Sequence, residues 1–498
     1  MRVSTPQLWL GGVAFALVAT LNAGGYRYGA SDQAFYIPAI LHQLDPALFP
    51  RDWAMLGAQG RFFFVDEIGA ALVGVSGLAL PVWFAIAQAA TLVALYAGAL
   101  AMGRAMLTTP WALAAWIAAL TLRHRIAKTG ANTLEGYFHP RMLVFGLGLL
   151  AVADVLRGRR VRPIAILLAG AALHPTTAAL FLVIVGVAVA LSDTRLRRPA
   201  LLAAGAAALV AVAALAAGVV PIDLTPMDPT WRALVATKDY TFPTTWSLST
   251  WLTNLAGPIV LAATAWTRHR DGRLTAPETG LVAGCLVLVA GFFASLPLIS
   301  AGVPIVVQLQ TSRAFWPVEI VATLFLVWWL VDRPARAAAP SMAARAVAAL
   351  VIGVSLARGI YVGFIESPDR PTLAFDLGRS DWDDALGWIR ASSPADAYVL
   401  ADPGHAWKPG MGTAVRIGAA RDVFLEETKD VAMAMYSRDA AHRVAARIEA
   451  AQGLDTMSEA DIRALAAREG LTLFVTPRTL ELPLLHRAGT VAVYRLTP

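Results

Sequence analysis

One acidic residue, Asp32, stands where the first apolar segment gives way to the aromatic-rich stretch Tyr26–Tyr36. Aromatic side chains favour the interface between membrane and water. A carboxylate at that interface loses part of its hydration, which makes it a stronger base. Asp32 is therefore a candidate general base. The alternative is that Ser31 or Asp32 only caps a surface helix that runs to about His42.

Imidazole and basic side chains also stand at the start of later apolar segments. His139 and Arg141 flank Pro140, and His174 directly precedes Pro175. Proline is favoured at the first position of a helix, so each histidine is expected at the N-cap position.

A third segment starts at Arg313, which follows two possible capping residues, Thr311 and Ser312. The N-terminus of a helix attracts phosphate, and arginine can bind a phosphate with two parallel hydrogen bonds. Taken singly, each histidine could be a simple cap and each arginine could extend to the membrane surface. All three starts are predicted on one face of the membrane, together with Asp32. This placement favours a phosphate site formed by His139, Arg141, His174 and Arg313.

Asp32 and Glu135 are the candidate catalytic acids beside this site. Two carboxylates next to a phosphate suit either proton transfer or the binding of a divalent cation such as Mg²⁺ or Mn²⁺. Their spacing does not distinguish these two roles. Glu319 lies within a predicted span below Arg313 and is expected to pair with it. The loop 223–240 either closes over the site or simply connects two spans.

The composition is that of a multi-pass membrane protein. Of the 498 residues, 57% are hydrophobic and only 15% are charged, whereas a soluble protein has about 25% charged residues. The net charge of +7 comes largely from arginines beside apolar segments, where they set the topology rather than bind nucleic acid. The single cysteine, Cys285, excludes an intrachain disulfide.

The apolar runs predict about eleven membrane segments, with the N-terminus inside. The arginine clusters at 157–162 and 195–198 then lie inside as well, as the positive-inside rule requires. Residues 62–80 are read as an incompletely inserted helix, because the alternative of a full span would move the 157–162 cluster outside. The predicted external loops are 24–80, 123–138, 221–248 and 300–312. The predicted spans are 8–23, 81–103, 110–122, 140–156, a hairpin within 163–191 that is broken at His174-Pro175, 199–220, 249–267, 279–299, 314–331 and 341–362.

The composition changes near residue 366 to that of a soluble domain. We expect a helix at 381–390, strands at 397–400, 423–425, 471–475 and 491–494, and helices near 431–450 and 458–469. The sequence thus predicts a mainly α protein with two domains. Residues 1–365 form a polytopic membrane helix bundle, and residues 366–498 form a small, soluble α/β domain outside the membrane.

Several short motifs carry a family resemblance. The runs Ser31–Tyr36, Asp45–Trp53, Phe138–Arg141 and His174-Pro175 resemble bacterial multi-pass proteins of the GT-C superfamily of membrane glycosyltransferases. The resemblance implies a GT-C-like fold, a polyprenyl-phosphate-linked sugar as donor, and Asp32 as the catalytic acid of the first external loop. The second loop has no Asp-x-Asp motif and offers only Glu135.

These features together predict a glycosyltransferase of the bacterial cytoplasmic membrane. It would move a hexose or pentose, with inversion, to a glycan, lipid or protein acceptor at the outer face. Nucleic acid is not expected as a partner, whereas membrane lipid is. A transporter or flippase of lipid-linked sugars, or a non-catalytic subunit of an envelope glycan assembly, are the alternatives. The absence of internal repeats and the clustering of candidate residues at one face favour the enzyme.

Overall fold

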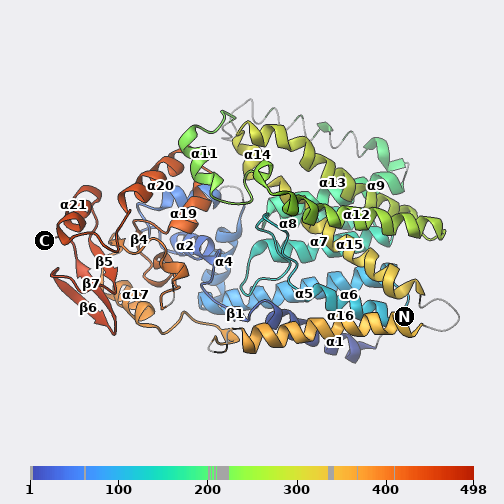
Figure 1. Ribbon diagram of the computed structural model, residues 1–498, viewed down its shortest axis with the longest axis horizontal. Helices are drawn as coiled ribbons and strands as arrows, with labels where there is room; N and C mark the ends of the chain where they lie inside the picture. Colours follow the sequence, from blue (N-terminus) through green and yellow to red (C-terminus); the bar gives the residue numbers. More distant parts are fainter. Residues whose placement is uncertain are drawn as a thin grey trace. The chain divides into compact units, whose positions relative to one another are not determined.

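The computed structural model (Figure 1) describes the chain apart from residues 1–3, 61–62, 194, most of 200–223, 335–340, 367, 369, 409 and 498. The predicted span 199–220 therefore lies almost wholly outside the described residues. The chain divides into two compact units. The first comprises Met1–Tyr26, Ala87–Pro226 and Asp239–Thr372, and the second comprises Arg27–Ile86, Met227–Lys238 and Leu373–Pro498.

The first unit is a bundle of apolar helices. Six helical segments in the described part of the chain are long and apolar enough to cross a membrane: Leu80–Met106, Pro175–Ser192, Leu248–Arg270, Ala276–Ser300, Pro304–Asp332 and Met342–Ile365. The protein is therefore a multi-pass membrane protein. The helices are α1 (Thr5–Asn22), α5 (Leu80–Met106, of which residues 87–106 belong here), α6 (Pro110–Leu120), α7 (Pro140–Leu156), α8 (Val161–Ala171), α9 (Pro175–Ser192), α12 (Leu248–Arg270), α13 (Ala276–Ser300), α14 (Pro304–Gln308), α15 (Phe315–Val327) and α16 (Met342–Ile360).

Small residues allow two of these helices to pack closely. On α13, a Cβ at Gly280 would lie 2.7 Å from the Cα of Ala188, and one at Gly284 would lie 2.8 Å from the Cα of Ile184 on α9. Glycine at both positions lets the two backbones approach each other, as is common in membrane helix pairs.

Prolines and short breaks set the helix boundaries. Helices α7 and α9 begin at Pro140 and Pro175, so the predicted interruption of 163–191 at His174-Pro175 is confirmed. The predicted span 314–331 consists of α15 and a π-helical turn, η3 (Trp328–Asp332). It is preceded by α14 and a 3-10 turn, η2 (Thr311–Ala314).

The C-terminal part of the second unit contains a five-stranded mixed sheet with the order β4-β3-β5-β7-β6. Strand β3 pairs in parallel with β4 and β5, while β7 runs antiparallel to β5 and β6. The strands are β3 (Tyr398–Leu400), β4 (Asp422–Val423), β5 (Leu473–Thr476), β6 (Leu484–Ala488) and β7 (Val491–Arg495). The apolar core of this region joins the sheet to α17 (Asp381–Ser392).

Two details of this region differ from the sequence prediction. The predicted helix at 431–450 is two helices, α19 (Glu427–Ala434) and α20 (Arg438–Ala450), because the Ser437 side chain caps a new helix. Strand β6 was not predicted. It is an edge strand that carries His486 and Arg487, and charged residues are common on sheet edges. Helix α21 (Glu459–Glu469) agrees with the prediction.

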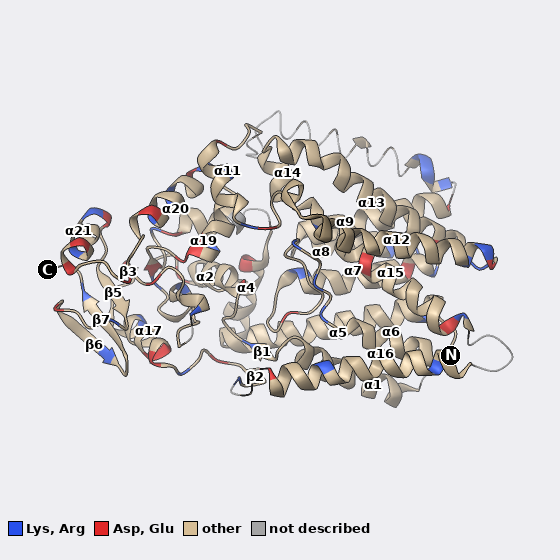
Figure 2. Ribbon diagram, in the orientation of Figure 1, with Lys and Arg blue, Asp and Glu red and all other residues tan. Residues whose placement is uncertain are grey.

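Segments from earlier in the sequence fold with this sheet in the second unit. They form α2 (Gln33–Leu44), α3 (Trp53–Gly60), α4 (Val65–Ser76) and α11 (Pro229–Ala236). Helix α3 packs against α19, and α11 packs against α20. Helix α4 has only 12 residues, fewer than the ~20 that a membrane helix needs. Charged residues are dense in α17, α19, α20 and α21 and sparse along the long helices of the first unit (Figure 2).

Candidate functional site

Asp32 stands at the N-cap position of α2, but its side chain does not cap the helix. Ser31 adopts a left-handed conformation with φ +50°, and the side chain of Asp32 makes no capping hydrogen bond. Its Oδ1 atom instead lies 2.7 Å from Nζ of Lys429, and a quarter of the Asp32 side chain is exposed (25%). The capping interpretation is therefore wrong, and Asp32 is an accessible carboxylate held by a lysine.

Lys429, on α19, is buried between this carboxylate and two aromatic rings. Its ammonium group lies 5.2 Å from the centroid of Phe35 and 5.8 Å from that of Trp407. A second lysine, Lys238, donates a hydrogen bond to the carbonyl oxygen of Thr428 (2.8 Å). Burial, and then the charge of Lys429, lower the pKa of Lys238. Sequence reasoning missed Lys429, which lies 397 residues from Asp32 in a helix without a recognisable motif.

Glu135 forms a buried ion pair with Arg141, with side-chain exposures of 3% and 5%. Asn132 Nδ2 and the Tyr137 hydroxyl also donate hydrogen bonds to Glu135 Oε1, at 3.1 and 3.3 Å. Neighbouring Gly136 has no room for a side chain, because a Cβ would collide with the carbonyl oxygen of Gly25. This geometry indicates that Glu135 holds the Arg141 guanidinium in a fixed position.

The two histidines cap their helices as predicted. His139 Nδ1 accepts a hydrogen bond from the backbone N–H of Arg141, and His174 Nδ1 accepts one from that of Thr177, both at 3.3 Å. The two imidazole rings lie with their centroids 6.0 Å apart. His174 is also within electrostatic reach of His139, Arg313 and Arg141. The structure therefore brings together all four residues predicted to bind phosphate, within the first unit.

Two details around Arg313 correct the sequence prediction. Thr311 and Ser312 do not cap a helix. Gln310 is left-handed (φ +49°), a 3-10 turn follows, and α15 begins only after Ala314, without a side-chain cap. Arg313 lies in that turn, and its Nε donates to the carbonyl oxygen of Thr129 (3.4 Å).

Glu319 does not pair with Arg313 as predicted. Its carboxylate lies 3.0 Å from Nδ1 of His124. The predicted pairing assumed neighbours on one helix, whereas the contact joins α15 to the loop after α6.

The two carboxylates predicted as possible ligands of a divalent cation each contact a basic side chain. Asp32 is paired with Lys429, and Glu135 is paired with Arg141, so a cation is already in contact with each acid. Asp32 belongs to the second unit and Glu135 to the first. Among the residues that the structure describes, no group of three or more His, Cys, Asp or Glu side chains could hold a metal ion.

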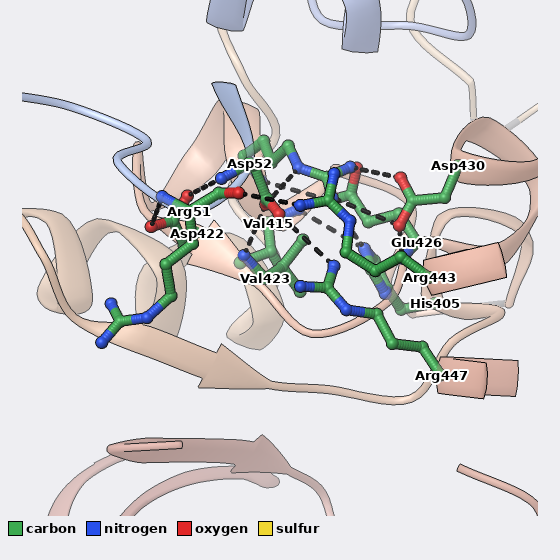
Figure 3. A network of polar contacts seen from close by, with 11 residues as sticks. Arg51, Asp52, His405, Val415, Asp422, Val423, Glu426, Asp430, Arg443 and Arg447 are labelled. Atoms are coloured by element: carbon green, nitrogen blue, oxygen red, sulfur yellow. Dashed lines mark hydrogen bonds and ion pairs between the residues drawn. The ribbon is translucent and has the colours of Figure 1, made fainter. Parts of the chain in front are cut away.

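A buried ionic network in the second unit includes Asp52, Glu426 and Asp430 (Figure 3). Arg416 is fully buried and binds three carboxylates. It donates to Asp52 at 2.8 Å, to Glu426 at 3.1 Å, and to both oxygens of Asp430 at 2.6 and 3.2 Å. Asp430 follows Lys429 on α19. The network therefore fixes the helix that presents Lys429 to Asp32.

Comparison with known proteins gives structural similarity only. No protein-family model and no curated protein matches the sequence. The arabinofuranosyltransferase AftD from Mycobacteria has a similar structure, with a TM-score of 0.51 and 12% identity over 100% of this chain and 40% of that protein. The chain thus spans less than half of the length of AftD.

Two structures of oligosaccharyltransferases from Archaeoglobus fulgidus, one of them named AglB, are also similar. The complex with an inhibitory peptide and a dolichol-phosphate has a TM-score of 0.47 and 12% identity, over 94% of this chain and 69% of that one. The apo form has a TM-score of 0.46 and 12% identity, over 95% and 70%. The similarity to AftD, over the whole of this chain, shows that this multi-pass membrane protein has a GT-C-like fold.

Proposed function

We propose that this protein is a membrane glycosyltransferase that moves a sugar from a polyprenyl-phosphate-linked donor to an acceptor at the outer face of a bacterial cytoplasmic membrane. The GT-C-like fold supports the reaction class. The observation that carries the proposal is Asp32, a partly exposed carboxylate held by Lys429. It lies in the loop where the family resemblance expects the catalytic acid.

In the proposed reaction, Asp32 accepts the proton of an acceptor hydroxyl. The hydroxyl oxygen forms a bond to the anomeric carbon of the donor sugar, while the bond from that carbon to the phosphate oxygen breaks. One direct displacement inverts the anomeric carbon and releases the polyprenyl phosphate. The ion pair with Lys429 orients the Asp32 carboxylate and leaves part of it accessible to the acceptor.

The four basic and imidazole residues of the first unit would stabilise the departing phosphate. His139 and His174 stand at the N-termini of α7 and α9, where free backbone N–H groups and the helix dipole favour an anion. Arg141 and Arg313 supply positive charge. Charge-stabilising groups that are fixed before the reaction contribute strongly to catalysis. In this scheme Glu135 positions Arg141.

The proposed arrangement in the membrane keeps about eleven segments, with the N-terminus inside and residues 366–498 outside. The polyprenyl chain of the donor would lie against the apolar helices. The acceptor would be a glycan, lipid or protein. The proposed scheme assigns no step to a divalent cation; Asp32 and Glu135 would be the candidate ligands of Mg²⁺ or Mn²⁺.

The proposal is tested by Asp32→Asn in liposomes that contain a panel of polyprenyl-phosphate sugars. An amide fills the space of the carboxylate but cannot accept the proton. We expect normal folding and donor binding with a transfer rate reduced ~10²–10⁴-fold. Asp45→Asn is the control, because Asp45 is an exposed acid near the end of α2 whose carboxylate accepts a hydrogen bond from the N–H of Ala47.

Transfer by Asp32→Asn at the parent's rate would contradict the proposal and leave Glu135 as the candidate base. Loss of donor binding together with transfer would show that Asp32 orders the loop or holds a metal ion. Repeating the assay with a chelator and with added Mg²⁺ or Mn²⁺ separates these two cases.

A further inference from the structure

An exposed tryptophan lies beside the candidate catalytic carboxylate. Trp407 ends the short turn η6 (His405–Trp407) and is 61% exposed. Tryptophan is large and apolar and is normally largely buried. Its exposure within the same unit as Asp32 requires an explanation.

A buried histidine in the same turn, His405, holds the turn in place by hydrogen bonds. The side chain of His405 is 0% exposed. Its Nδ1–H donates to the carbonyl oxygen of Asp402 (2.6 Å), and its Nε2 accepts from the N–H of Val415 (3.4 Å). The indole of Trp407 therefore projects from an anchored turn, which lowers the entropy cost of binding a ligand to it.

One ammonium group connects this indole to Asp32. Nζ of Lys429 faces the ring of Trp407 at 5.8 Å from its centroid and contacts Asp32 Oδ1 at 2.7 Å. Phe35 lies on the same ammonium group at 5.2 Å. An open aromatic surface, a hydrogen-bond donor and an accessible carboxylate thus occur side by side within the second unit.

A sugar ring matches this combination of groups. One face of the ring presents C–H groups, which are attracted to the negative face of an aromatic system, while its edge carries hydroxyls that hydrogen-bond with carboxylate and ammonium groups. An acyl chain would use the indole but offer no hydrogen-bonding group to the carboxylate, and a peptide lacks the rigid C–H face. We propose that Trp407 is the stacking platform for a sugar ring of the acceptor, so that the acceptor of the proposed transfer is a glycan.

This inference rests on the proposed function, because only a transferase has an acceptor. Its test measures sugar binding and requires no transfer. Full-length protein in lipid nanodiscs, without donor, is titrated with four soluble fluorescent oligosaccharides built from arabinose, mannose, glucose or galactose. We expect at least one to bind the parent. Trp407→Ala should weaken this binding about tenfold, which corresponds to ~1.4 kcal/mol. Trp407→Phe, which keeps an aromatic face, should weaken it no more than about threefold.

Trp388→Ala is the matched control, because Trp388 is partly accessible in the same unit and is already stacked on His486 at 5.0 Å. It should bind the oligosaccharide as the parent does, and thermal unfolding should show that all variants fold. The inference is overturned if no oligosaccharide binds the parent, or if Trp407→Ala binds as tightly as the parent. It is also overturned if Trp407→Ala weakens only the binding of a polyprenyl-phosphate sugar, which would assign the platform to the donor. Glycan binding at Trp407 without any transfer would contradict the proposed function alone.

Discussion

At the scale of single residues, Asp32 and Glu135 differ in their surroundings. Asp32 is partly exposed and forms an ion pair with Lys429. Glu135 is buried and receives hydrogen bonds from Arg141, Asn132 and Tyr137. In the proposed function, the accessible Asp32 is therefore the candidate base, and the buried Glu135 is a positioning residue for Arg141.

The two arginines of the predicted phosphate site should respond differently to substitution. Arg141→Ala would leave the buried Glu135 carboxylate without its counter-charge, and we expect it to lower the free energy of unfolding by ~3–5 kcal/mol. Arg313 is less buried, so Arg313→Ala should mainly weaken the binding of a polyprenyl-phosphate analogue, by ten- to a hundredfold for a loss of ~1.5–3 kcal/mol. Thermal unfolding and equilibrium binding in detergent measure the two effects.

The control for this pair is Arg270→Ala, because Arg270 is an exposed arginine in the last turn of α12. It should bind the analogue as the parent does. Parent-like binding by Arg313→Ala would show that Arg313 is not a phosphate ligand.

At the scale of elements, helix α19 joins the candidate catalytic residue to the buried network. Lys429 contacts Asp32, while the next residue, Asp430, binds both Nη atoms of Arg416. Arg416 in turn binds Asp52, which also accepts a hydrogen bond from the N–H of Val423 on β4 (3.1 Å). The position of Lys429 thus depends on a set of ion pairs that are inaccessible to water.

Two carboxyl groups near this network predict opposite effects of pH on stability. For Glu426, burial opposes ionisation, but the charge of Arg416 and the hydrogen bond from the backbone N–H of Arg416 outweigh it and lower the pKa to about 2. This stabilisation is present above the unfolded pKa of ~4.3 and is lost as the pH falls toward 2. For Asp422, burial and then the charge of Asp52 raise the pKa to about 6. The resulting stabilisation is present below the unfolded-state pKa of ~3.9 and is lost as the pH rises through 6.

The combined contribution of Glu426 and Asp422 to the free energy of unfolding should therefore be largest near pH 4–5. Asp422→Asn should flatten the decline in melting temperature between pH 4 and 7, and Glu426→Gln should flatten the decline below pH 4. Thermal unfolding in detergent across this range measures both. A profile of Asp422→Asn as steep as the parent's between pH 4 and 7 would show that Asp422 does not titrate there.

At the scale of the whole molecule, the second unit is assembled from three separated stretches of the chain, 27–86, 227–238 and 373–498. Segments that pack together without a complete candidate membrane span among them are expected to lie on one side of the membrane. The topology derived from the arginine clusters puts nearly all residues of these three stretches outside. The two arguments are independent, since one uses charge and the other uses tertiary packing.

The topology is tested with a reporter enzyme that is active only outside the membrane. A fusion after Pro498 should be active, and fusions near Arg160 and Arg198 should be silent. An active fusion at Arg160 would move the loop 123–138, and with it Glu135, to the inner side. A silent fusion after Pro498 would contradict the external placement of residues 366–498.

The sequence alone determined the features that depend on local chemistry. The apolar runs and prolines defined the helices, so α7 and α9 start at the predicted residues. The capping roles of His139 and His174 followed from the same His-Pro pattern. The family resemblance carried by short motifs also indicated the GT-C-like fold that the structure of AftD supports.

Only the tertiary structure decided which charged residues are partners. Lys429 with Asp32, Arg416 with Asp52, and His124 with Glu319 are pairs separated by 397, 364 and 195 residues in the chain. No periodicity or motif links such residues, because an ion pair depends on how whole helices and strands pack. The same packing excluded a capping role for Asp32 and brought Trp407 to its ammonium partner. The local sequence thus selected the candidate residues, and the long-range packing of the chain defined their chemical environment.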